Sequence, residues 1–203
     1  MKKNKGILIV LSGPSGAGKD TVLGKLLENR NDIDLSVSYT TRTPRSGEIN
    51  GKDYHFVDKD IFQKAINDGE MLEYACYCGN YYGTPRFEVE KNLESGRSVI
   101  LEIEVQGAEQ VIKKCPEAVS IFIVPPSIEE LKKRLKNRAS DSEEAVRLRV
   151  SEAEKEISLA EHYKYIVINN DVKLCADNVS KIIDSEYMKS SRMGYIIKEV
   201  LKK

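Results

Sequence analysis

The sequence reads Gly13-Pro14-Ser15-Gly16-Ala17-Gly18-Lys19-Asp20-Thr21 between two apolar segments, and this stretch decides the fold of the chain. Residues 7–11 before it form an apolar run of strand length, and residues 22–27 after it carry apolar side chains at helical spacing. A strand, a glycine-rich turn and a helix in this order are the context of a phosphate-binding loop. The glycines let backbone N–H groups point at an anion, and Lys19 supplies a cation beside the positive end of the helix dipole. An ordinary glycine-rich turn needs neither the lysine nor this spacing.

One position departs from the usual phosphate-loop pattern. A Ser or Thr is expected directly after the lysine, because its hydroxyl binds Mg²⁺, but here Asp20 stands there and Thr21 follows. Either Asp20 binds the metal through a water, or the phosphate oxygens hold it by themselves. The sequence leaves open which protein groups touch the metal.

Composition excludes several classes of protein. The 203 residues suit one α/β domain with insertions, and 40% apolar content is enough for a core. Lys plus Arg equals Asp plus Glu, 32 each, so no overall field selects nucleic acid or an anionic membrane. No apolar run approaches the ~20 residues of a membrane span, and the basic start lacks a signal-peptide cleavage site. We therefore expect a cytoplasmic protein.

The four cysteines include the pair Cys76-Tyr77-Cys78, which raises the possibility of zinc. A zinc site would need two further ligands at recognisable spacing, and the two histidines of the chain are not near a second pair. Reduced cysteines packed in a sheet are the preferred interpretation.

Strands and helices are predicted to alternate outside two insertions. A strand is expected at 35–39, a turn at 79–83, and a helix capped by Thr84 with Pro85 at its first position. A strand is expected at 99–105, followed by Gly107 and then a helix through Ile112. Residues 119–124 read as a strand covered on both faces. The remaining predicted elements are a helix capped by Asp58, one opened by Ser127, one reaching about 160, and a strand at 165–169.

The chain is predicted to end in two amphipathic helices, near 176–188 and 193–201. The second has an apolar face formed by Met193, Ile196, Ile197 and Val200. That face packs either on the core or on another subunit, and we expect the core.

Two clusters outside the loop suit a phosphoryl group, which needs cations around it and protection from water. The first cluster lies in the β-rich part and consists of Arg42, Arg45, Tyr54 and Tyr82. The second is helical and consists of Arg134, Arg138, Arg147 and Arg149. A charged run on a helix is often only a solvated face. The phosphate loop upstream favours function, and a parallel sheet with two flaps suggests a phosphotransferase that closes over two ligands.

Glu73 is the anion of interest among these cations. A carboxylate accepts two parallel hydrogen bonds, and the N1–H and 2-amino group of guanine form a matching edge that adenine lacks. A site built on that pair would reject adenine strongly. Taken alone, Glu73 would read as a surface residue at a strand end.

Together with these residues, several motifs make the sequence resemble the guanylate kinase family along nearly its whole length. The matching motifs are 13–19, 38–48 (SYTTRTPRSGE), 51–56, 79–84 (GNYYGT), 101–107 and 125–127. The second and fourth are highly specific, because other nucleoside-monophosphate kinases lack them. The resemblance implies a P-loop NTPase-type α/β fold with a three-layer parallel sheet. It divides the single domain into a core (1–37, 85–126, 150–203), a GMP-binding insertion (38–84) and a helical lid (about 127–149).

The resemblance also implies the reaction ATP + GMP ⇌ ADP + GDP with Mg²⁺ as the cofactor. Residues Gly13 to Thr21 would bind the ATP phosphates, with Asn169 near adenine. The GMP phosphate would be held by Arg42, Arg45, Tyr54 and Tyr82, and guanine would be read by Ser38, Glu73 and Thr84. The catalytic set would be Lys19, Arg42, Arg134, Arg138 and Arg149, and Arg149 matches the family arginine better than Arg147. Glu102 and Glu104 stand where many members carry Asp, in contact with guanine or a metal-bound water.

Two alternatives stay open. Guanylate-kinase-like domains also serve in scaffolds as non-catalytic modules that bind phosphorylated partners, but those chains usually have degraded phosphate loops, and this one keeps Lys19. A kinase for another nucleoside monophosphate is the second alternative. The resemblance makes dGMP a further substrate, and the oligomeric state is left open.

Overall fold

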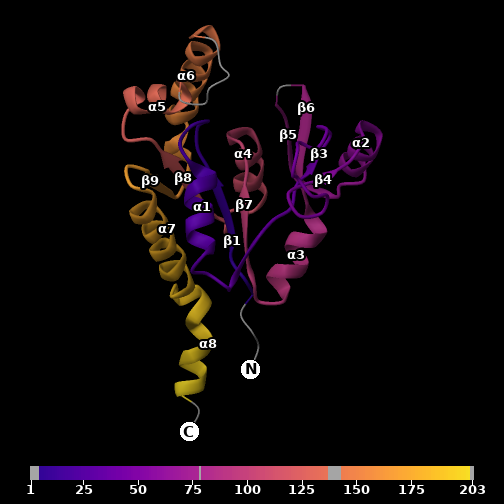
Figure 1. Ribbon diagram of the computed structural model, residues 1–203. Helices are drawn as coiled ribbons and strands as arrows, with labels where there is room; N and C mark the ends of the chain where they lie inside the picture. Colours follow the sequence, from indigo (N-terminus) through magenta and orange to yellow (C-terminus); the bar gives the residue numbers. More distant parts are fainter. Residues whose placement is uncertain (1–4, 78, 137–142, 202–203) are drawn as a thin grey trace.

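A five-stranded parallel sheet forms the centre of the molecule, with strand order β2-β7-β1-β8-β9. The computed structural model describes residues 5–77, 79–136 and 143–201 (Figure 1). The strands are β1 (Leu8–Ser12), β2 (Ile33–Leu35), β7 (Ser98–Glu102), β8 (Val119–Val124) and β9 (Tyr165–Ile168). The carboxyl ends of β1, β7, β8 and β9 therefore meet along one edge of the sheet, where ligands bind in open α/β folds.

Helices cover both faces of this sheet, which confirms the three-layer fold. Alternate residues of β1 point to opposite faces: Ile9 and Leu11 pack with α1 (Lys19–Leu27) and α7 (Val172–Tyr187). Val10 packs on the other face with α3 (Arg86–Glu94) and α4 (Val105–Lys114). All three side chains are fully buried, so the strand that leads into the phosphate loop lies inside the core, between the two layers of helices.

A second, four-stranded sheet stands beside the carboxyl edge of the first, with order β4-β3-β6-β5. Its strands are β3 (Tyr39–Thr40), β4 (His55–Phe56), β5 (Met71–Tyr77) and β6 (Asn80–Pro85). Helix α2 (Lys59–Asn67) closes a small core with Phe62, Ala65 and Met71. Asp58 caps this helix by accepting a hydrogen bond from the Ile61 N–H, as predicted.

Helices α5 (Ile128–Lys136) and α6 (Glu143–Ser158) pair with each other opposite the second sheet, and we call this pair the helical flap (Figure 1). Ser127 Oγ accepts the Glu130 N–H at 3.1 Å, so the predicted cap is confirmed. Leu131, Leu135, Val146 and Val150 form a small core of their own. A 3-10 turn, η1 (Ala160–His162), leads from α6 into β9.

The predicted strand at 35–39 is wrong, because the chain changes sheets there. β2 ends at Leu35 in the parallel sheet, and β3 begins at Tyr39 in the second sheet. The alternating pattern is therefore divided between two short strands.

The turn at 79–83 and the Thr84 helix cap are also wrong. Residues 80–85 form β6, antiparallel to β5, and α3 begins only at Arg86. The Thr84 hydroxyl donates to Glu73 Oε1 at 2.6 Å instead of capping the helix. The Thr84 hydroxyl thus binds a residue of the neighbouring strand, although the local sequence pattern had assigned it to a helix cap.

Three helices begin earlier than predicted, and in one of them a capping side chain marks the start. β7 ends at Glu102, and Gly107 lies inside α4, which begins at Val105. α7 begins at Val172, where Asp171 accepts the Leu174 N–H at 2.8 Å. α8 begins at Ser190, three residues before the predicted helix.

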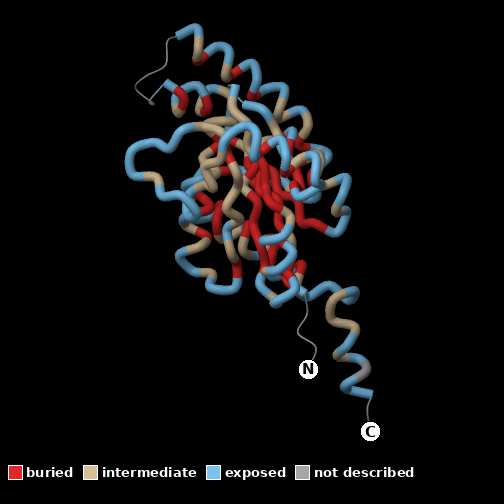
Figure 2. Tube along the Cα trace, turned by 90° about the vertical axis from the view of Figure 1, so that its right-hand side faces the viewer, coloured by how far each residue is buried: buried red, intermediate tan, exposed pale blue. Residues whose placement is uncertain are grey.

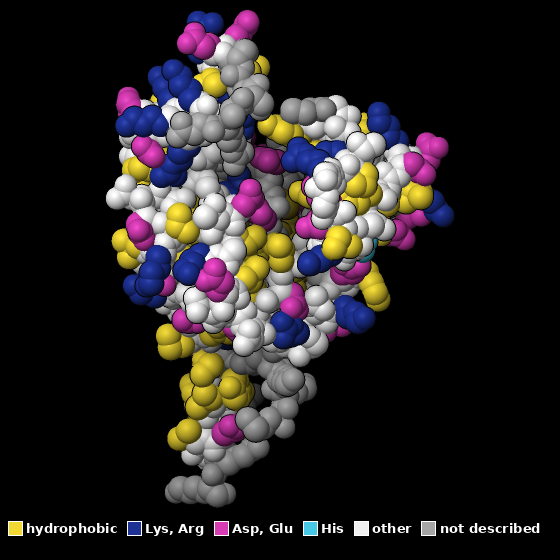
Figure 3. Space-filling model, in the orientation of Figure 1, with side chains coloured by type: hydrophobic (Ala, Val, Ile, Leu, Met, Phe, Trp, Pro, Cys, Tyr) yellow, Lys and Arg dark blue, Asp and Glu magenta, His cyan; other side chains and the backbone are white. Residues whose placement is uncertain are grey.

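Helix α8 (Ser190–Val200) does not pack on the core. It extends away from the body of the molecule (Figure 2), and Figure 3 shows apolar side chains along it. Ile197 and Val200 are 61% and 75% exposed, so the expectation of core packing is wrong.

The cysteines are distributed differently from the prediction. Cys76 is exposed on β5, whereas Cys175 is buried in helix α7 and Cys115 ends α4. Cys78 lies outside the described residues. In the described ranges, no three His, Cys, Asp or Glu side chains gather as a metal site, and no helix has the length and apolarity of a membrane span.

Candidate functional site

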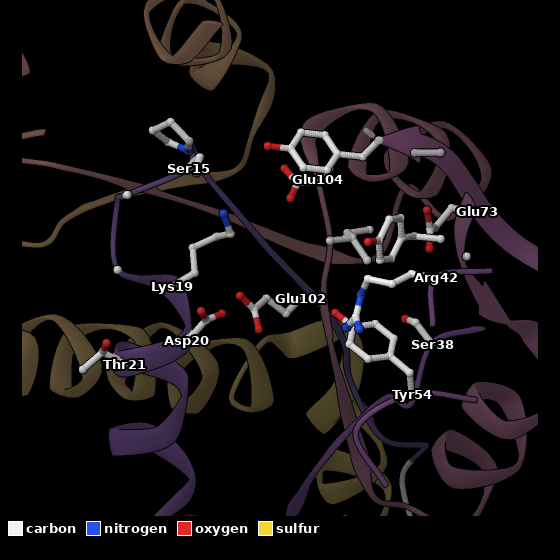
Figure 4. A pocket seen from close by; sticks show the side chains of 18 of the residues that line it. Ser15, Lys19, Asp20, Thr21, Ser38, Arg42, Tyr54, Glu73, Glu102 and Glu104 are labelled. Atoms are coloured by element: carbon white, nitrogen blue, oxygen red, sulfur yellow. The ribbon is translucent and has the colours of Figure 1, made fainter. Parts of the chain in front are cut away.

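A cavity of about 270 Å³ lies between the phosphate loop (residues 13–19) and the second sheet. Figure 3 shows the hollow from outside, and Figure 4 shows its side chains. The predicted site residues in its lining are Pro14, Ser15, Gly16, Gly18, Lys19, Asp20, Thr21, Ser38, Arg42, Arg45, Tyr54, Glu73, Tyr82, Glu102 and Glu104. Residues far apart in the sequence thus line one cleft between the phosphate loop and the second sheet.

The phosphate loop has the backbone that its glycines predict. Gly16 has a φ of +88°, which L side chains rarely adopt. A Cβ on Gly16 would lie 2.9 Å from side-chain carbons of Leu131 and Leu135, so the loop requires glycine there also for packing. Lys19 Nζ donates to the Gly13 carbonyl across the loop at 2.7 Å. The lysine is therefore held over the ring of backbone amides that would receive phosphate.

Two of the predicted lid arginines contact the phosphate loop directly. Arg134 donates to the Ala17 carbonyl at 3.4 Å and to the Asn169 carbonyl at 3.0 Å. Arg149 donates to Ser15 Oγ at 2.7 Å. Arg147 is exposed. Arg138 lies outside the described residues.

Asn169 directly follows β9, and its side chain contacts the backbone of the phosphate loop. Its side chain is 2% exposed, and its Nδ2 donates to the Ala17 carbonyl at 2.7 Å. A Cβ on Gly18 would lie 2.6 Å from the same Nδ2, so the amide fits closely under the loop. Asn169 is thus placed to shape the loop rather than to line the cavity.

Asp20 and Glu102 form a carboxyl pair beside Lys19 (Figure 4). Burial, and then the hydrogen bond to Asp20, raise the pKa of Glu102 to about 8, with Lys19 opposing the shift. Two hydrogen-bonded carboxyl groups share a proton readily, and a divalent cation is an alternative bridge between them. Their oxygens suit a hard metal ion such as Mg²⁺.

Arg42 is fixed by Glu48, a residue that sequence reasoning missed. Its Nη1 and Nη2 donate to the two Glu48 oxygens at 2.8 Å each, and the Arg45 N–H donates to the same carboxylate. The guanidinium lies 5.3 Å from the Tyr54 ring centre and 5.6 Å from that of Phe56. Hydrogen bonds from Arg42 lower the pKa of Glu48 to about 2.

Tyr54 and Tyr82 stand beside this arginine at the mouth of the cavity. Their ring centres are 6.0 Å apart in an edge-on arrangement. Burial raises the pKa of Tyr54, so its hydroxyl stays a hydrogen-bond donor at neutral pH. Arg45 also lines the cavity. The four residues of the first predicted cluster are therefore brought together.

Glu73 is buried, which excludes the reading as a surface residue. It is 3% exposed and accepts from Thr84 Oγ1 at 2.6 Å, and Ser38 Oγ lies 3.4 Å from the same hydroxyl. Burial raises the pKa of Glu73 to about 7, against the lowering effect of Thr84. Ser38 and Glu73 line the cavity, and Thr84 lies behind them.

Gly107 is a second residue that sequence reasoning did not assign to the site. A Cβ at this position of α4 would lie 2.2 Å from Glu73 Oε2. The glycine therefore creates the space that the carboxylate occupies. A glycine inside an amphipathic helix, where it costs about 1 kcal/mol relative to alanine, is the signal that could have revealed this packing role.

The comparisons with known proteins agree with one another. The family model for guanylate kinase matches residues 5–186. A guanylate kinase of Oceanobacillus iheyensis is 50% identical over 99% of this chain and 98% of its own length. That of Clostridioides difficile is 48% identical over 98% and 97%. A solved guanylate kinase of Anaplasma phagocytophilum aligns with a TM-score of 0.77 at 41% identity, covering 94% of this chain and 90% of that one.

Proposed function

This chain belongs to the guanylate kinase family, and we infer that it transfers a phosphoryl group from ATP to GMP, giving ADP and GDP. The observation that carries this function is the shared cavity. An intact phosphate loop with Lys19 and a buried carboxylate, Glu73, line the same cleft from opposite sides. A phosphate donor and a guanine acceptor would therefore meet inside it.

For the acceptor, we propose that Glu73 binds the N1–H and 2-amino group of guanine. Thr84 occupies one carboxylate oxygen and Gly107 makes room for the other, which supports a fixed orientation of the acceptor pair. Ser38 lies beside them. The GMP phosphate would bind at Arg42, Arg45, Tyr54 and Tyr82, whose guanidinium and hydroxyl groups suit a phosphate. These proposed contacts go to base and phosphate, so we propose dGMP as a further substrate.

For the donor, we propose that residues 13–21 bind the ATP phosphates, with Lys19 on the outer ones. Arg134 and Arg149 reach the loop from the helical flap, which supports their role as lid residues on the transferred phosphoryl. Asn169 would act by shaping the loop near the adenine end. The proposed division into core, GMP-binding insertion and lid follows the boundaries that the sequence predicts.

A nucleotide kinase of this type generally uses ATP with a divalent metal, and we propose Mg²⁺. The described carboxyl pair Asp20 and Glu102 fits it, because both are oxygen donors beside the proposed phosphate site. When bound, Mg²⁺ would supply positive charge against the phosphates of ATP. Glu104 lines the cavity next to this pair.

The chain's residues would act mainly by positioning and by neutralising charge. An oxygen of the GMP phosphate is already an anion, so it can attack the terminal phosphorus of ATP in line without a strong general base. Lys19, Arg42, Arg134 and Arg149 would offset the repulsion between the two nucleotides. No covalent intermediate on the protein is required.

The test is an assay of ADP release with ATP and each of GMP, dGMP, AMP, CMP and UMP. We expect turnover with GMP and dGMP and little with the others. Turnover with another monophosphate at a comparable kcat/KM would contradict the guanine assignment. Absence of turnover together with binding of a phosphorylated peptide would favour the non-catalytic module.

A further inference from the structure

Strand β5, which carries Glu73, is an outer strand of the second sheet. It pairs with β6 on one side, and no strand of the described chain pairs with its other side. Along such an edge, the backbone N–H and C=O groups are free to bind other partners. Helix α4 packs against β5 and also against β1 of the parallel sheet (Figure 1). The position of β5 relative to the core therefore depends on α4.

Gln110 of α4 takes the place of the missing strand neighbour. Its side-chain amide forms two hydrogen bonds with one residue of β5: Nε2 donates to the Tyr74 carbonyl at 2.6 Å, and Oε1 accepts the Tyr74 N–H at 3.3 Å. A primary amide bonded in this way reproduces the donor and the acceptor of a paired strand residue. The same Nε2 donates to the Gln106 carbonyl at 3.3 Å, which ties the side chain to its own helix.

Lys114, one turn further along α4, holds the backbone on the other side of Glu73. Its Nζ donates to the Leu72 carbonyl at 2.9 Å. Leu72 lies in a β-bulge, because the register of β5 against β6 shifts between Met71 and Glu73. A bulge changes the direction in which a neighbouring side chain points. The contacts from α4 therefore bracket Glu73 at the irregular part of its strand.

Three residues of α4 thus face the same short segment of β5, residues 72–74. Gly107, Gln110 and Lys114 are spaced by three and four residues, so they lie on one face of the helix. Gly107 leaves the space that Glu73 Oε2 occupies, and the other two hold the backbone before and after this residue. Helix α4, and not β6 alone, therefore sets where the Glu73 carboxylate lies.

We propose that Gln110 is a positioning residue for base recognition: by holding Tyr74 against α4, it fixes the direction of the Glu73 carboxylate toward the acceptor base. Two parallel hydrogen bonds to guanine require a fixed carboxylate, because hydrogen bonds weaken steeply when the acceptor turns. Gln110 is not among the described residues that line the cavity, so it acts through β5. This proposal rests on the proposed function, because it assumes that Glu73 reads guanine.

The test compares wild-type protein with Gln110→Met in steady-state assays of ATP with GMP and with inosine monophosphate, which lacks the 2-amino group of guanine. Methionine is uncharged, suits a helix and removes both hydrogen bonds to Tyr74. We expect the KM for GMP to rise by about threefold to tenfold, with the KM for ATP within about twofold of wild type. The preference in kcat/KM for GMP over inosine monophosphate should fall by about threefold or more, since only GMP offers the second hydrogen bond.

Gln63→Met is the matched control, because it makes the same change at an exposed position of α2. It should leave both KM values and the base preference within about twofold of wild type. Gln110→Ala is a second variant, which removes the same two bonds without adding an apolar side chain and should change the KM for GMP and the base preference in the same way. Circular dichroism melting curves establish that each variant is folded.

The possible failures can be told apart. A merely structural role of Gln110 predicts a lower melting temperature with unchanged KM values and unchanged base preference. That result in the folded Gln110 variants, with GMP turnover in wild type, would overturn this inference alone. Absence of GMP turnover in wild type would overturn the proposed function and, with it, this inference.

Discussion

The phosphate loop and the β-rich insertion face the same cavity but offer their ligands different chemical groups. The loop presents backbone amides and one lysine, and its shape depends on glycines and on packing against α5. The insertion presents side chains, chiefly the fixed guanidinium of Arg42 and the buried carboxylate of Glu73. Backbone amides recognise charge and suit any polyphosphate, whereas oriented side chains distinguish one base from another.

The two regions also differ in their effect on the stability of the folded protein. The loop amides lie at the start of α1, where the first N–H groups of a helix lack intrahelical partners anyway. Glu73, in contrast, is a carboxyl group placed in a buried position that raises its pKa to about 7. The ionised Glu73 carboxylate therefore reduces stability in its buried position, whereas the loop amides leave no hydrogen bond of the helix unmade.

The largest effect is expected from Lys19→Met, which tests the loop side alone. Removing the cation next to the transferred phosphoryl should lower kcat by about a hundredfold to a thousandfold. GMP affinity should change by less than about twofold, because the insertion is untouched. Steady-state kinetics and calorimetry measure the two quantities. Lys25→Met on the same helix is the control. A kcat near the wild-type value in Lys19→Met would show that the phosphate loop does not act on the transferred phosphoryl group.

Glu73→Gln tests the insertion side. The amide presents an N–H₂ where guanine also has donors, so kcat/KM for GMP should fall by about a hundredfold. ATP affinity should stay the same. Glu70→Gln, an exposed change three residues away, should have no such effect. If the GMP-to-AMP preference of Glu73→Gln equals that of wild type, Glu73 does not read the base.

Gly107→Ala sharpens the comparison by moving Glu73 without replacing it. A Cβ only 2.2 Å from Glu73 Oε2 must displace the carboxylate, so the KM for GMP should rise by about tenfold with the KM for ATP unchanged. Gly24→Ala on α1 is the control, because no atom lies within 4 Å of its Cβ, and it should stabilise the protein slightly. An unchanged KM for GMP in Gly107→Ala would show that the carboxylate position is not critical.

The smallest effect concerns pH and stability. Glu73 has a folded-state pKa of about 7 against 4.5 ordinarily, so the folded protein binds the extra proton between these values. The penalty therefore develops as pH rises from 4.5 to 7 and is fully present above 7. Glu73→Gln should gain on the order of 2 kcal/mol of unfolding free energy relative to wild type at pH 8 and little at pH 4.5. Urea unfolding at the two pH values measures it.

The same titration predicts a functional pH dependence. Below pH 7 a protonated Glu73 can no longer accept both guanine hydrogen bonds, so the KM for GMP should rise as pH falls. This rise should be absent in Glu73→Gln, which separates it from titration of the GMP phosphate. A wild-type KM that is flat between pH 6 and pH 8 would contradict the assignment.

The sequence allowed the core and the loop to be predicted because their signals are local. Strand length, glycine spacing and helix caps identified the phosphate loop, residues 119–124 and the caps at Asp58 and Ser127. The insertion was harder, since β3 and β4 have two residues each and depend on pairing across the sheet. Thr84 illustrates the limit: its partner, Glu73, is eleven residues away and replaces the local cap.

The site residues show the same division. Those that belong to the phosphate-loop motif were predictable from spacing. In the insertion, residue chemistry indicated Arg42, Arg45, Tyr54, Tyr82 and Glu73, whereas Ser38 and Thr84 came from the resemblance. Glu48 and Gly107 act through neighbours that are brought close only by the fold, namely Arg42 and Glu73. The prediction that helix α8 packs on the core was wrong for a different reason. Its apolar face is a local signal for burial, but the fold leaves this face exposed.

The parallel arrangement of the central strands gives the molecule two unlike ends. The phosphate loop and Asn169 follow the carboxyl ends of β1 and β9, and Glu102 is the last residue of β7. Lys5 lies at the opposite end of the molecule, where Arg192 of α8 donates to its carbonyl, and α8 extends from there away from the cleft (Figure 1). An affinity tag or a fluorescent fusion at either terminus should therefore leave nucleotide entry unobstructed, and immobilisation through them would orient every cleft toward solution.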